Sequence, residues 1–382
     1  MTPSAQSSKE HKTLSAAPLP RIKVLGLGGG GSNAINRMIE LGLSGVDYIG
    51  ANTDAQALKN CLAPTRIQLG PSLTRGLGAG GNPDIGEKAA EESDREITKA
   101  LDGADMVFLT AGMGGGTGTG AIPVAARISR SLGAVTIGVV TTPFSFEIGK
   151  RQQNAAAGLT KLRQHTDTLI TIPNDRLLKI SPRDLPLELA FRLADDLLRQ
   201  GIQGITELVT QPGMINVDFA HVRNMMKNGG GAILVVGYGQ GENSALQAVK
   251  QALNHPLLDA IPLEQAAGII ANFSGSDDLA FVEIADALMY LHKNTNTDTD
   301  VIPGININPQ FKDRVEAILV ITGLEGKAVD HKMRGLQQEK LQPEFPPQME
   351  KVVAVESENH TDFVFSESNL DIPSFIRRRI RA

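Results

Sequence analysis

Two glycine-rich segments, each placed directly after a run of apolar residues, constrain this sequence more than any other feature. The first is GLGGGGSN at 26–33, at the end of the apolar run 22–27, and the second is AGMGGGTGTG at 111–120, at the end of the run 106–111. Glycine lets the backbone come close to a ligand, and a helix that opens there presents free N–H groups and the positive end of its dipole. Both segments therefore predict phosphate-binding loops.

Taken alone, the first segment leaves two kinds of nucleotide open. Gly26, Gly28 and Gly31 satisfy the dinucleotide fingerprint, and Asp54 could serve as its ribose-binding acid. A dinucleotide unit needs only one such loop, whereas two loops at neighbouring strand ends would hold one polyphosphate from both sides. The sequence has no G-x-x-x-x-G-K-[ST] motif, so it does not predict a P-loop protein. A nicotinamide-dependent oxidoreductase stays the less favoured alternative.

Short apolar runs alternate with helical stretches over the first half of the sequence, and this alternation predicts a parallel α/β sheet. A long helix is expected next, starting at Pro186 and stopped by Pro212-Gly213. A second, α+β set of elements follows it. We expect strands at 22–27, 48–51, 106–111, 134–141, 169–172, 232–238, 268–272, 301–307 and 315–322, and helices at 32–41, 186–210, 245–253 and 281–292.

These elements predict two domains joined by a helix and followed by a tail. Residues 324–369 are rich in Glu, Gln, Lys, Pro and Ser, which is typical of a disordered linker. The last residues, LDIPSFIRRRIRA, are apolar and then basic, which favours a docking peptide over a solvated end. The expected segments are a disordered N-terminal segment (1–20), a nucleotide-binding domain (21–185), a central helix (186–212), a smaller α+β domain (213–323), a disordered linker (324–369) and a docking peptide (370–382).

Composition excludes several classes of function. The net charge of -5, the 4% aromatic content and the absence of Trp argue against a nucleic-acid-binding protein. The single cysteine, Cys61, indicates a reducing compartment. The first 20 residues do not have the pattern of a secretory signal, and no run of 18 apolar residues could span a membrane. We therefore expect a cytoplasmic protein.

The segment GGGTGTG at 114–120 is the signature of the tubulin/FtsZ family, and the chain resembles that family over about residues 21–323 and at its end. The resemblance implies a Rossmann-like parallel-sheet GTPase domain joined by a long central helix to a smaller α+β domain. The other family motifs occur in the family's order: GGGGSNA (28–34), NTDAQAL (52–58), TRGLGAGGNPDIGEKAA (74–90), TTPFSFE (141–147), TIPNDRLL (171–178), PGMINVDFA (212–220) and the terminal DIPSFIRRR (371–379).

The resemblance also implies a GTP/GDP site. It assigns the γ-phosphate to the loop 78–81, the ribose to Glu147 and Arg151, and Mg²⁺ to phosphates and waters rather than to a protein metal site. Guanine would stack on Phe191 and hydrogen-bond to Asp195 and Asn33, with Asn174 nearby. The loop residues in contact with phosphate would be Gly28, Gly29, Gly30, Gly31, Ser32, Asn33, Gly78, Ala79, Gly80, Gly81, Gly114, Gly115, Gly116, Thr117, Gly118 and Thr119.

Hydrolysis in this family depends on a loop that acts on the next subunit's nucleotide, with the pattern N-x-D-x-x-D. The corresponding residues here are Asn216, Asp218 and His221, so an imidazole stands where the second carboxylate is expected. An imidazole supplies no fixed negative charge, although it can accept a proton from water. We expect turnover to be slower by roughly 10–100-fold than with a carboxylate there. Asp218 could instead serve only as a helix cap.

Together these features predict a GTP-hydrolysing cell-division protein that polymerises head-to-tail at the division site. The alternative is a divergent paralogue that forms a nearly inactive structural filament. The docking peptide would bind membrane-anchoring division adaptors. Its predicted contact residues are Asp371, Ile372, Pro373, Phe375, Arg377 and Arg378.

Overall fold

The computed structural model describes residues 19–147, 149–179, 186–210, 218–255, 258, 263–307 and 311–324. Several predicted features lie outside these residues: the N-terminal segment up to residue 18, the helix stop at 212–213, Asn216, the linker beyond Leu324 and the docking peptide with all six of its predicted contact residues.

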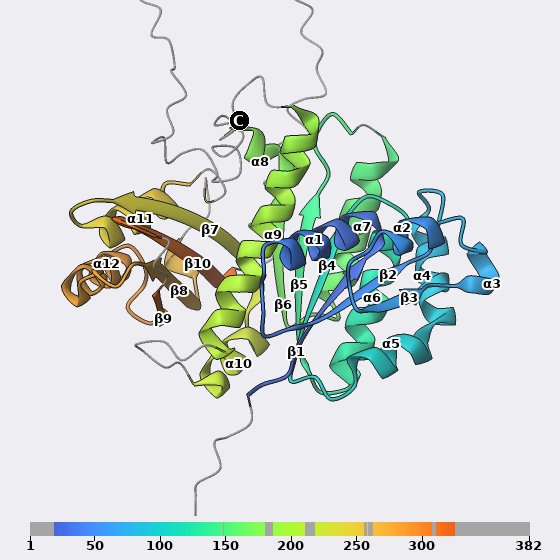
Figure 1. Ribbon diagram of the computed structural model, residues 1–382, viewed down its shortest axis with the longest axis horizontal. Coiled ribbons are helices and arrows are strands. Elements are labelled where there is room, and N and C mark those ends of the chain that lie inside the picture. Colours follow the sequence, from blue (N-terminus) through green and yellow to red (C-terminus); the bar gives the residue numbers. More distant parts are fainter. Residues whose placement is uncertain are drawn as a thin grey trace, which may run out of the picture.

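The strands in the described part of the chain form one hydrogen-bonded sheet of ten strands in the order β3-β2-β1-β4-β5-β6-β7-β10-β8-β9 (Figure 1). Pairing is parallel from β3 to β7, antiparallel on both sides of β10, and parallel again between β8 and β9. The strands are β1 (Ile22–Leu27), β2 (Asp47–Asn52), β3 (Thr65–Gln68), β4 (Met106–Gly112), β5 (Val135–Thr142), β6 (Thr168–Pro173), β7 (Gly230–Gln240), β8 (Gly268–Gly275), β9 (Asp300–Ile307) and β10 (Arg314–Leu324).

Helices cover both faces of the sheet, and a short 3₁₀ helix lies at Leu263–Gln265. The α-helices are α1 (Gly28–Glu40), α2 (Ala55–Lys59), α3 (Pro71–Thr74), α4 (Pro83–Glu92), α5 (Asp94–Leu101), α6 (Thr117–Ser131), α7 (Lys150–Arg163), α8 (Asn174–Lys179), α9 (Leu187–Thr210), α10 (Phe219–Lys227), α11 (Ser244–Leu253) and α12 (Phe281–Lys293). Within the residues described, no helix is both long enough and apolar enough to cross a membrane.

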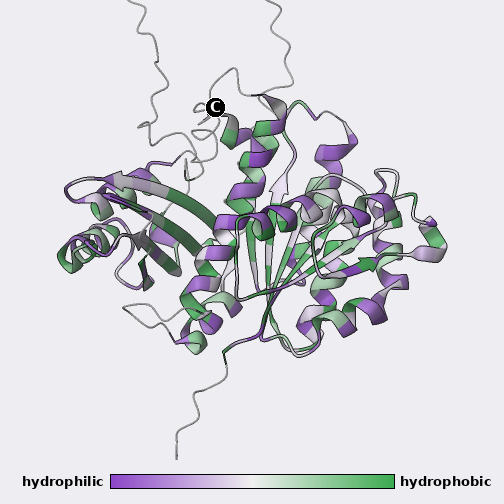
Figure 2. Cartoon of the chain, viewed as in Figure 1, coloured by the Kyte–Doolittle hydropathy of each residue, from purple (hydrophilic) through white to green (hydrophobic). Residues whose placement is uncertain are grey.

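Alternation along the strands decides which helix packs on which face. On β1, Ile22 and Val24 join a core with α1, α9 and α10, whereas Leu25 and Leu27 join a core with α4 to α7. A third core forms between α11, α12 and the last four strands. Hydrophobic residues accordingly follow the strands, and the surrounding helices carry hydrophilic residues outward (Figure 2). All nine predicted strands and the long helix are confirmed.

Helix α9 connects the two halves of the molecule. It lies between the first six strands and the last four in Figure 1, and Ile202, Ile205 and Leu208 bury against the core shared by both halves. The two halves also share backbone hydrogen bonds, because β6 and β7 pair over three residues, from Thr168 opposite Gly230 to Ile170 opposite Ala232. One continuous sheet thus runs through both predicted domains.

The predicted start of the first helix at Ser32 is wrong by four residues, because the helix begins at Gly28. Glycine is unfavourable in the interior of a helix, but tertiary packing outweighs that preference here. A Cβ at Gly31 would lie 2.5 Å from the carbonyl oxygen of Thr110 on β4. A side chain at Gly31 would therefore clash with β4, which explains why this helical position is glycine.

Candidate active site

The two glycine loops lie side by side because they follow neighbouring strands. β1 and β4 pair in parallel at the point where the strand order of the sheet reverses, and ligands of α/β sheets bind at such a point. The backbones touch directly: a Cβ at Gly28 would lie 2.8 Å from the backbone N of Gly118, and one at Gly30 would lie 2.9 Å from that of Gly112. The predicted pairing of the two loops at adjacent strand ends is confirmed.

The threonines of the second loop hold its shape from within. The buried hydroxyl of Thr119 accepts a hydrogen bond of 2.8 Å from the backbone N–H of Gly114. The hydroxyl of Thr117 lies 2.6 Å from that of Thr53, which follows β2. Asp54, the alternative ribose-binding acid, instead caps α2 by accepting from Gln56 N–H at 2.8 Å and Ala57 N–H at 3.0 Å. This use of Asp54 disfavours the dinucleotide alternative.

At two positions in these loops, neither the backbone conformation nor the packing of the fold requires glycine. Most glycines in the described part of the chain either have a positive φ or leave no room for a side chain. Gly29 and Gly115, one in each loop, have ordinary φ values, and no atom lies within 4 Å of the position that a Cβ would take there. The space that their side chains would fill is therefore open, and a ligand bound at the loops can use it.

We expect Gly29→Ala and Gly115→Ala each to weaken GTP binding by about 10-fold or more while leaving the melting temperature nearly unchanged. Gly28→Ala is the contrasting variant, because Gly28 has φ +70 and its Cβ would strike Gly118. It should lower the melting temperature as well. Thermal denaturation without nucleotide and equilibrium binding of GTP would measure both effects. Unchanged GTP affinity in both of the first two variants would contradict a ligand at this position.

The third predicted loop, 78–81, approaches the second one. Gly78, Gly80 and Gly81 all have positive φ values, which explains their residue type. Asn154 on α7 ties the loops together, since its side-chain N–H group donates to Gly81 O at 3.2 Å and to Gly114 O at 3.3 Å. Sequence reasoning did not single out Asn154, and only its position on α7 beside both loops reveals it.

Aromatic side chains gather at the end of α9 that is nearest the loops. Phe191 is partly exposed and meets the buried Phe144 edge to face, with ring centroids 5.3 Å apart. Phe144 also stacks on the exposed Phe146 at 5.0 Å. Exposed aromatic faces of this kind suit a purine base, so Phe146 joins the predicted Phe191 as a candidate stacking residue.

The predicted ribose contacts lie next to the second loop. Glu147 and Arg151 form an ion pair, and Glu147 also accepts from the backbone N–H of Phe144 at 2.9 Å. A Cβ at Gly114 would lie 2.9 Å from the carbonyl oxygen of Arg151. The two residues therefore border the nucleotide loops, and their contact with a ribose stays a prediction.

Two polar side chains of this region are buried without a partner among the described residues. They are the hydroxyl of Ser32, in the first loop, and the side-chain oxygen of Asn174, directly after β6. Unpaired buried polar atoms are costly, so native proteins normally satisfy them. A bound nucleotide would supply acceptors and donors at both ends of the site, so these orphan atoms support the predicted site.

Asp195 lies on α9 facing α1, where Arg37 is near it. Burial raises its pKa to about 7, and the neighbouring Asp196 also raises it, while Arg37 opposes the rise. Asn33 lies one turn before Arg37 on the same helix, and contact of Asn33 and Asp195 with guanine stays a prediction. Arg37 was not predicted, and its positive charge opposes the rise in the pKa of Asp195.

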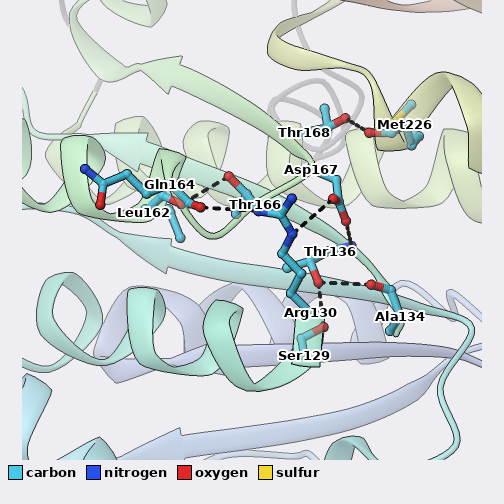
Figure 3. Close-up of polar contacts among 10 residues, drawn as sticks. All are labelled: Ser129, Arg130, Ala134, Thr136, Leu162, Gln164, Thr166, Asp167, Thr168 and Met226. Atoms are coloured by element: carbon cyan, nitrogen blue, oxygen red, sulfur yellow. Dashed lines mark hydrogen bonds and ion pairs between the residues drawn. The ribbon is translucent and has the colours of Figure 1, made fainter. Parts of the chain in front are cut away.

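Two of the three predicted catalytic residues, Asp218 and His221, are described, and they lie at the other pole of the molecule. Asp218 caps α10 by accepting from Ala220 N–H at 2.9 Å, and His221 follows one turn later. α10 is fastened to the start of β6, because Thr168 donates a hydrogen bond to Met226 O, beside the Arg130–Asp167–Thr136 contacts (Figure 3). The nucleotide loops, in contrast, follow the carboxyl ends of the parallel strands, at the opposite edge of the sheet from the start of β6.

The length of α9 separates these two poles. Its 24 residues span about 36 Å, and the 15 steps from Asp195 to Thr210 span about 22 Å. α8 and the start of α9 lie at one end of the molecule, and α10 lies at the opposite end (Figure 1). Asp218 therefore cannot reach the nucleotide loops of its own subunit.

Metal coordination was predicted to involve no protein cage. Among the described residues, no three His, Cys, Asp or Glu side chains come together as a metal site. Mg²⁺ on nucleotide phosphates stays a prediction.

The fold and the loops define a nucleotide-binding protein of the tubulin type, with a phosphate site at the strand reversal and a long helix leading away from it. Residues 21–182 match the GTPase domain of the tubulin/FtsZ family, and residues 230–325 match the C-terminal domain of the FtsZ family. The chain therefore belongs to the FtsZ family, within the tubulin/FtsZ group of GTPases.

Solved structures agree with this assignment. The chain is similar to FtsZ of M. jannaschii, solved as an empty dimer, with 44% identity over 82% of this chain and 91% of that one and a TM-score of 0.78. CetZ2 from Haloferax volcanii, solved as a GTPγS-bound protofilament, is 19% identical over 83% of this chain and 98% of that one, with a TM-score of 0.70. CetZ from Methanosaeta thermophila is 20% identical over 84% and 92%, with a TM-score of 0.67. At that identity the CetZ proteins share the fold alone.

Proposed function

We propose that this chain hydrolyses GTP as a subunit of a head-to-tail filament in the cell-division ring. The observation that carries the proposal is the placement of two incomplete half-sites at opposite poles. The glycine loops can hold a triphosphate, but they contain no acid or base. Asp218 and His221 are exposed at the far end of α9. Stacking a second copy on the first would bring the two halves together.

Each part of the site has a definite task in this proposal. Backbone N–H groups of the two loops bind the phosphates, and Mg²⁺ on the phosphates would offset their charge when bound. The loop 78–81 approaches the γ-phosphate, so its contacts differ between GTP and GDP. Asp218 of the adjoining subunit orients and polarises the attacking water. Hydrolysis then requires assembly.

Dependence of the rate on protein concentration tests the proposal. We expect phosphate release per molecule to rise steeply with protein concentration at saturating GTP, since every active site needs two subunits. Sedimentation of the same samples should show that the rate follows the assembled fraction. The chain should prefer GTP to ATP and ignore NAD. A rate per molecule that dilution does not change would contradict the shared site.

A second candidate function is a structural filament of a divergent paralogue with little hydrolysis. The observation that favours it is His221, which stands where the family has a carboxylate. Such a protein would bind GTP and sediment, yet release almost no phosphate. The same experiment separates the two candidates.

The proposal also assigns a function to the C-terminal tail. Its terminal apolar and basic residues, 370–382, would bind membrane-anchoring division adaptors and so bring the filament to the division site. Filament formation itself would depend on residues 21–323.

A further inference from the structure

His221 is paired with a carboxylate that lies far away in the sequence. Its ring nitrogen Nε2 lies 2.6 Å from Oδ2 of Asp300, 79 residues further along the chain. Both side chains are about half exposed, on the same pole of the molecule as Asp218. The position that lacks a carboxylate in the loop sequence is therefore in contact with one supplied by the first residue of β9.

Both partners are held by rigid elements. On α10, Val222 and Met226 are buried, and Met225 packs so closely on β8 that a Cβ at Gly268 would lie 2.9 Å from its terminal carbon. Asp300 begins β9 opposite Gly268 and donates its backbone N–H to Ala267 O at 3.2 Å. The pair is therefore set by the packing of α10 on β8 and by the pairing of β8 with β9.

The residue before Asp300 is fixed as well. Thr299 is buried, and its hydroxyl donates to Ala266 O at 2.9 Å. Exposed ion pairs contribute little to stability, so the fold has little need of this contact. A role in chemistry is a better explanation for a carboxylate aimed at the imidazole.

The contact decides which ring nitrogen can act as a base. An ionised carboxylate can only accept a hydrogen bond, so Nε2 must carry the hydrogen that faces Asp300. In a neutral imidazole the other nitrogen, Nδ1, then holds the free lone pair. Among the described residues, Nδ1 has no hydrogen-bond partner. A carboxylate that fixes the tautomer of a histidine in this way is a common means of preparing a general base.

We propose that Asp300 is a positioning residue that turns His221 into the proton acceptor for the nucleotide of the adjoining subunit. This proposal rests on the proposed GTPase function and identifies how the departure from the family pattern is offset. His221 and Asp300 act as one unit beside Asp218, so the chain keeps a general base at this position.

The oxygen of water forms a bond to the γ-phosphorus while one of its O–H protons moves to Nδ1 of His221. The bond between the γ-phosphorus and the bridging oxygen breaks, and GDP leaves with its electron pair. The carboxylate of Asp300 stabilises the imidazolium that forms. The imidazolium then releases its proton to solvent, and phosphate departs.

The experiment is a cycle of variants at two positions. Asp300→Asn is expected to lower the turnover per sedimented subunit by about 10-fold at saturating GTP, because the amide no longer selects one tautomer. GTP affinity and the sedimented fraction should not change. Asp298→Asn is the matched control, since Asp298 is an exposed carboxylate of the same loop without a side-chain contact among the described residues. It should leave turnover unchanged.

The His221→Asp background separates a chemical role from a structural one. There the base is a carboxylate, and Asp300 would only repel it, so adding Asp300→Asn should leave turnover unchanged or raise it. The proposal is overturned if Asp300→Asn leaves turnover intact in the natural background. It is also overturned if the same loss occurs in both backgrounds, which would indicate a structural role.

Measurements on the natural chain distinguish failure of the role of Asp300 from failure of the proposed GTPase function. If it hydrolyses GTP with a steep concentration dependence and Asp300→Asn does not lower that rate, the positioning role alone is wrong. If the natural chain binds no GTP, or hydrolyses it independently of concentration, the proposed function fails and the role of Asp300 fails with it.

Discussion

Asp218→Asn is expected to lower the GTP turnover of the assembled protein by at least about 100-fold, because the attacking water would lose the carboxylate that orients it. Asparagine caps a helix as well as aspartate does, so the hydrogen bond from Ala220 N–H should persist. The melting temperature should therefore stay the same. GTP affinity of the isolated subunit should also be unchanged, because α9 keeps Asp218 away from its own nucleotide.

Phosphate release per sedimented subunit, equilibrium GTP binding and thermal denaturation would check these three results. Asp102→Asn is a suitable control, because Asp102 is an exposed residue directly after α5 and its side chain makes no hydrogen bond or ion pair within the described residues. A variant that loses GTP binding together with turnover would indicate that Asp218 belongs to its own subunit's site. Undiminished turnover would leave Asp218 as a helix cap only.

Buried parallel strands were the most predictable part of the fold. β4 and β5 are apolar on both faces, and a continuous apolar run of that length between glycines has few other interpretations. β3 was missed because it is a short edge strand in which only Ile67 is buried. The first turn of α1 was missed because its glycines predict a loop, whereas in the structure they begin the helix and Gly30 and Gly31 pack against β4.

The phosphate loops could be predicted for the same physical reason. Glycines after a buried strand must lie at the end of the sheet where parallel strands finish, so both loops had to meet if their strands were neighbours. The residues that bind the guanine base could be predicted only from the resemblance to the tubulin/FtsZ family. Nothing in the spacing of Phe191 and Asp195 separates a base-binding face from a core phenylalanine and a solvated aspartate.

Contacts between distant segments could not be predicted from one sequence. Asp300 starts an ordinary strand, and Asn154 is one polar residue among many on α7. Asp300 matters because its partner His221 lies 79 residues away in the sequence. Asn154 matters because its partners Gly81 and Gly114 lie 73 and 40 residues away. The sequence therefore indicated a missing carboxylate next to Asp218, while the fold supplies one from β9.

Asp195→Asn is expected to have opposite effects on stability and on binding. In the nucleotide-free protein, burial raises the pKa of Asp195 from 3.8 to about 7. Between those values the folded state holds a proton that the unfolded chain releases, so the free energy of unfolding falls as the pH rises through this window. At pH 8 the variant lacks this charge and should be more stable by about 2 kcal/mol, roughly half of what the full pKa shift corresponds to, because the side chain of Asp195 is partly exposed.

Binding should change in the other direction. An ionised carboxylate accepts from the two N–H donors on the edge of guanine, and an amide can accept only one of them. Loss of charged hydrogen bonds of this kind corresponds to about a 100-fold weaker affinity for GTP and a reduced preference over ATP. In the natural chain, GTP affinity should rise as the pH increases through about 7, because Asp195 must lose its proton to bind guanine.

Titration calorimetry between pH 6 and pH 8.5, with melting curves of the nucleotide-free proteins, would measure both effects. Glu188→Gln removes an exposed carboxylate from the same helix and should follow the natural chain at every pH. A natural chain whose GTP affinity is flat across pH 7, or an Asp195→Asn variant that binds GTP normally, would place guanine recognition elsewhere. A variant that is more stable without nucleotide and binds GTP more weakly would show that the charge of Asp195 serves nucleotide binding, because this charge destabilises the nucleotide-free fold.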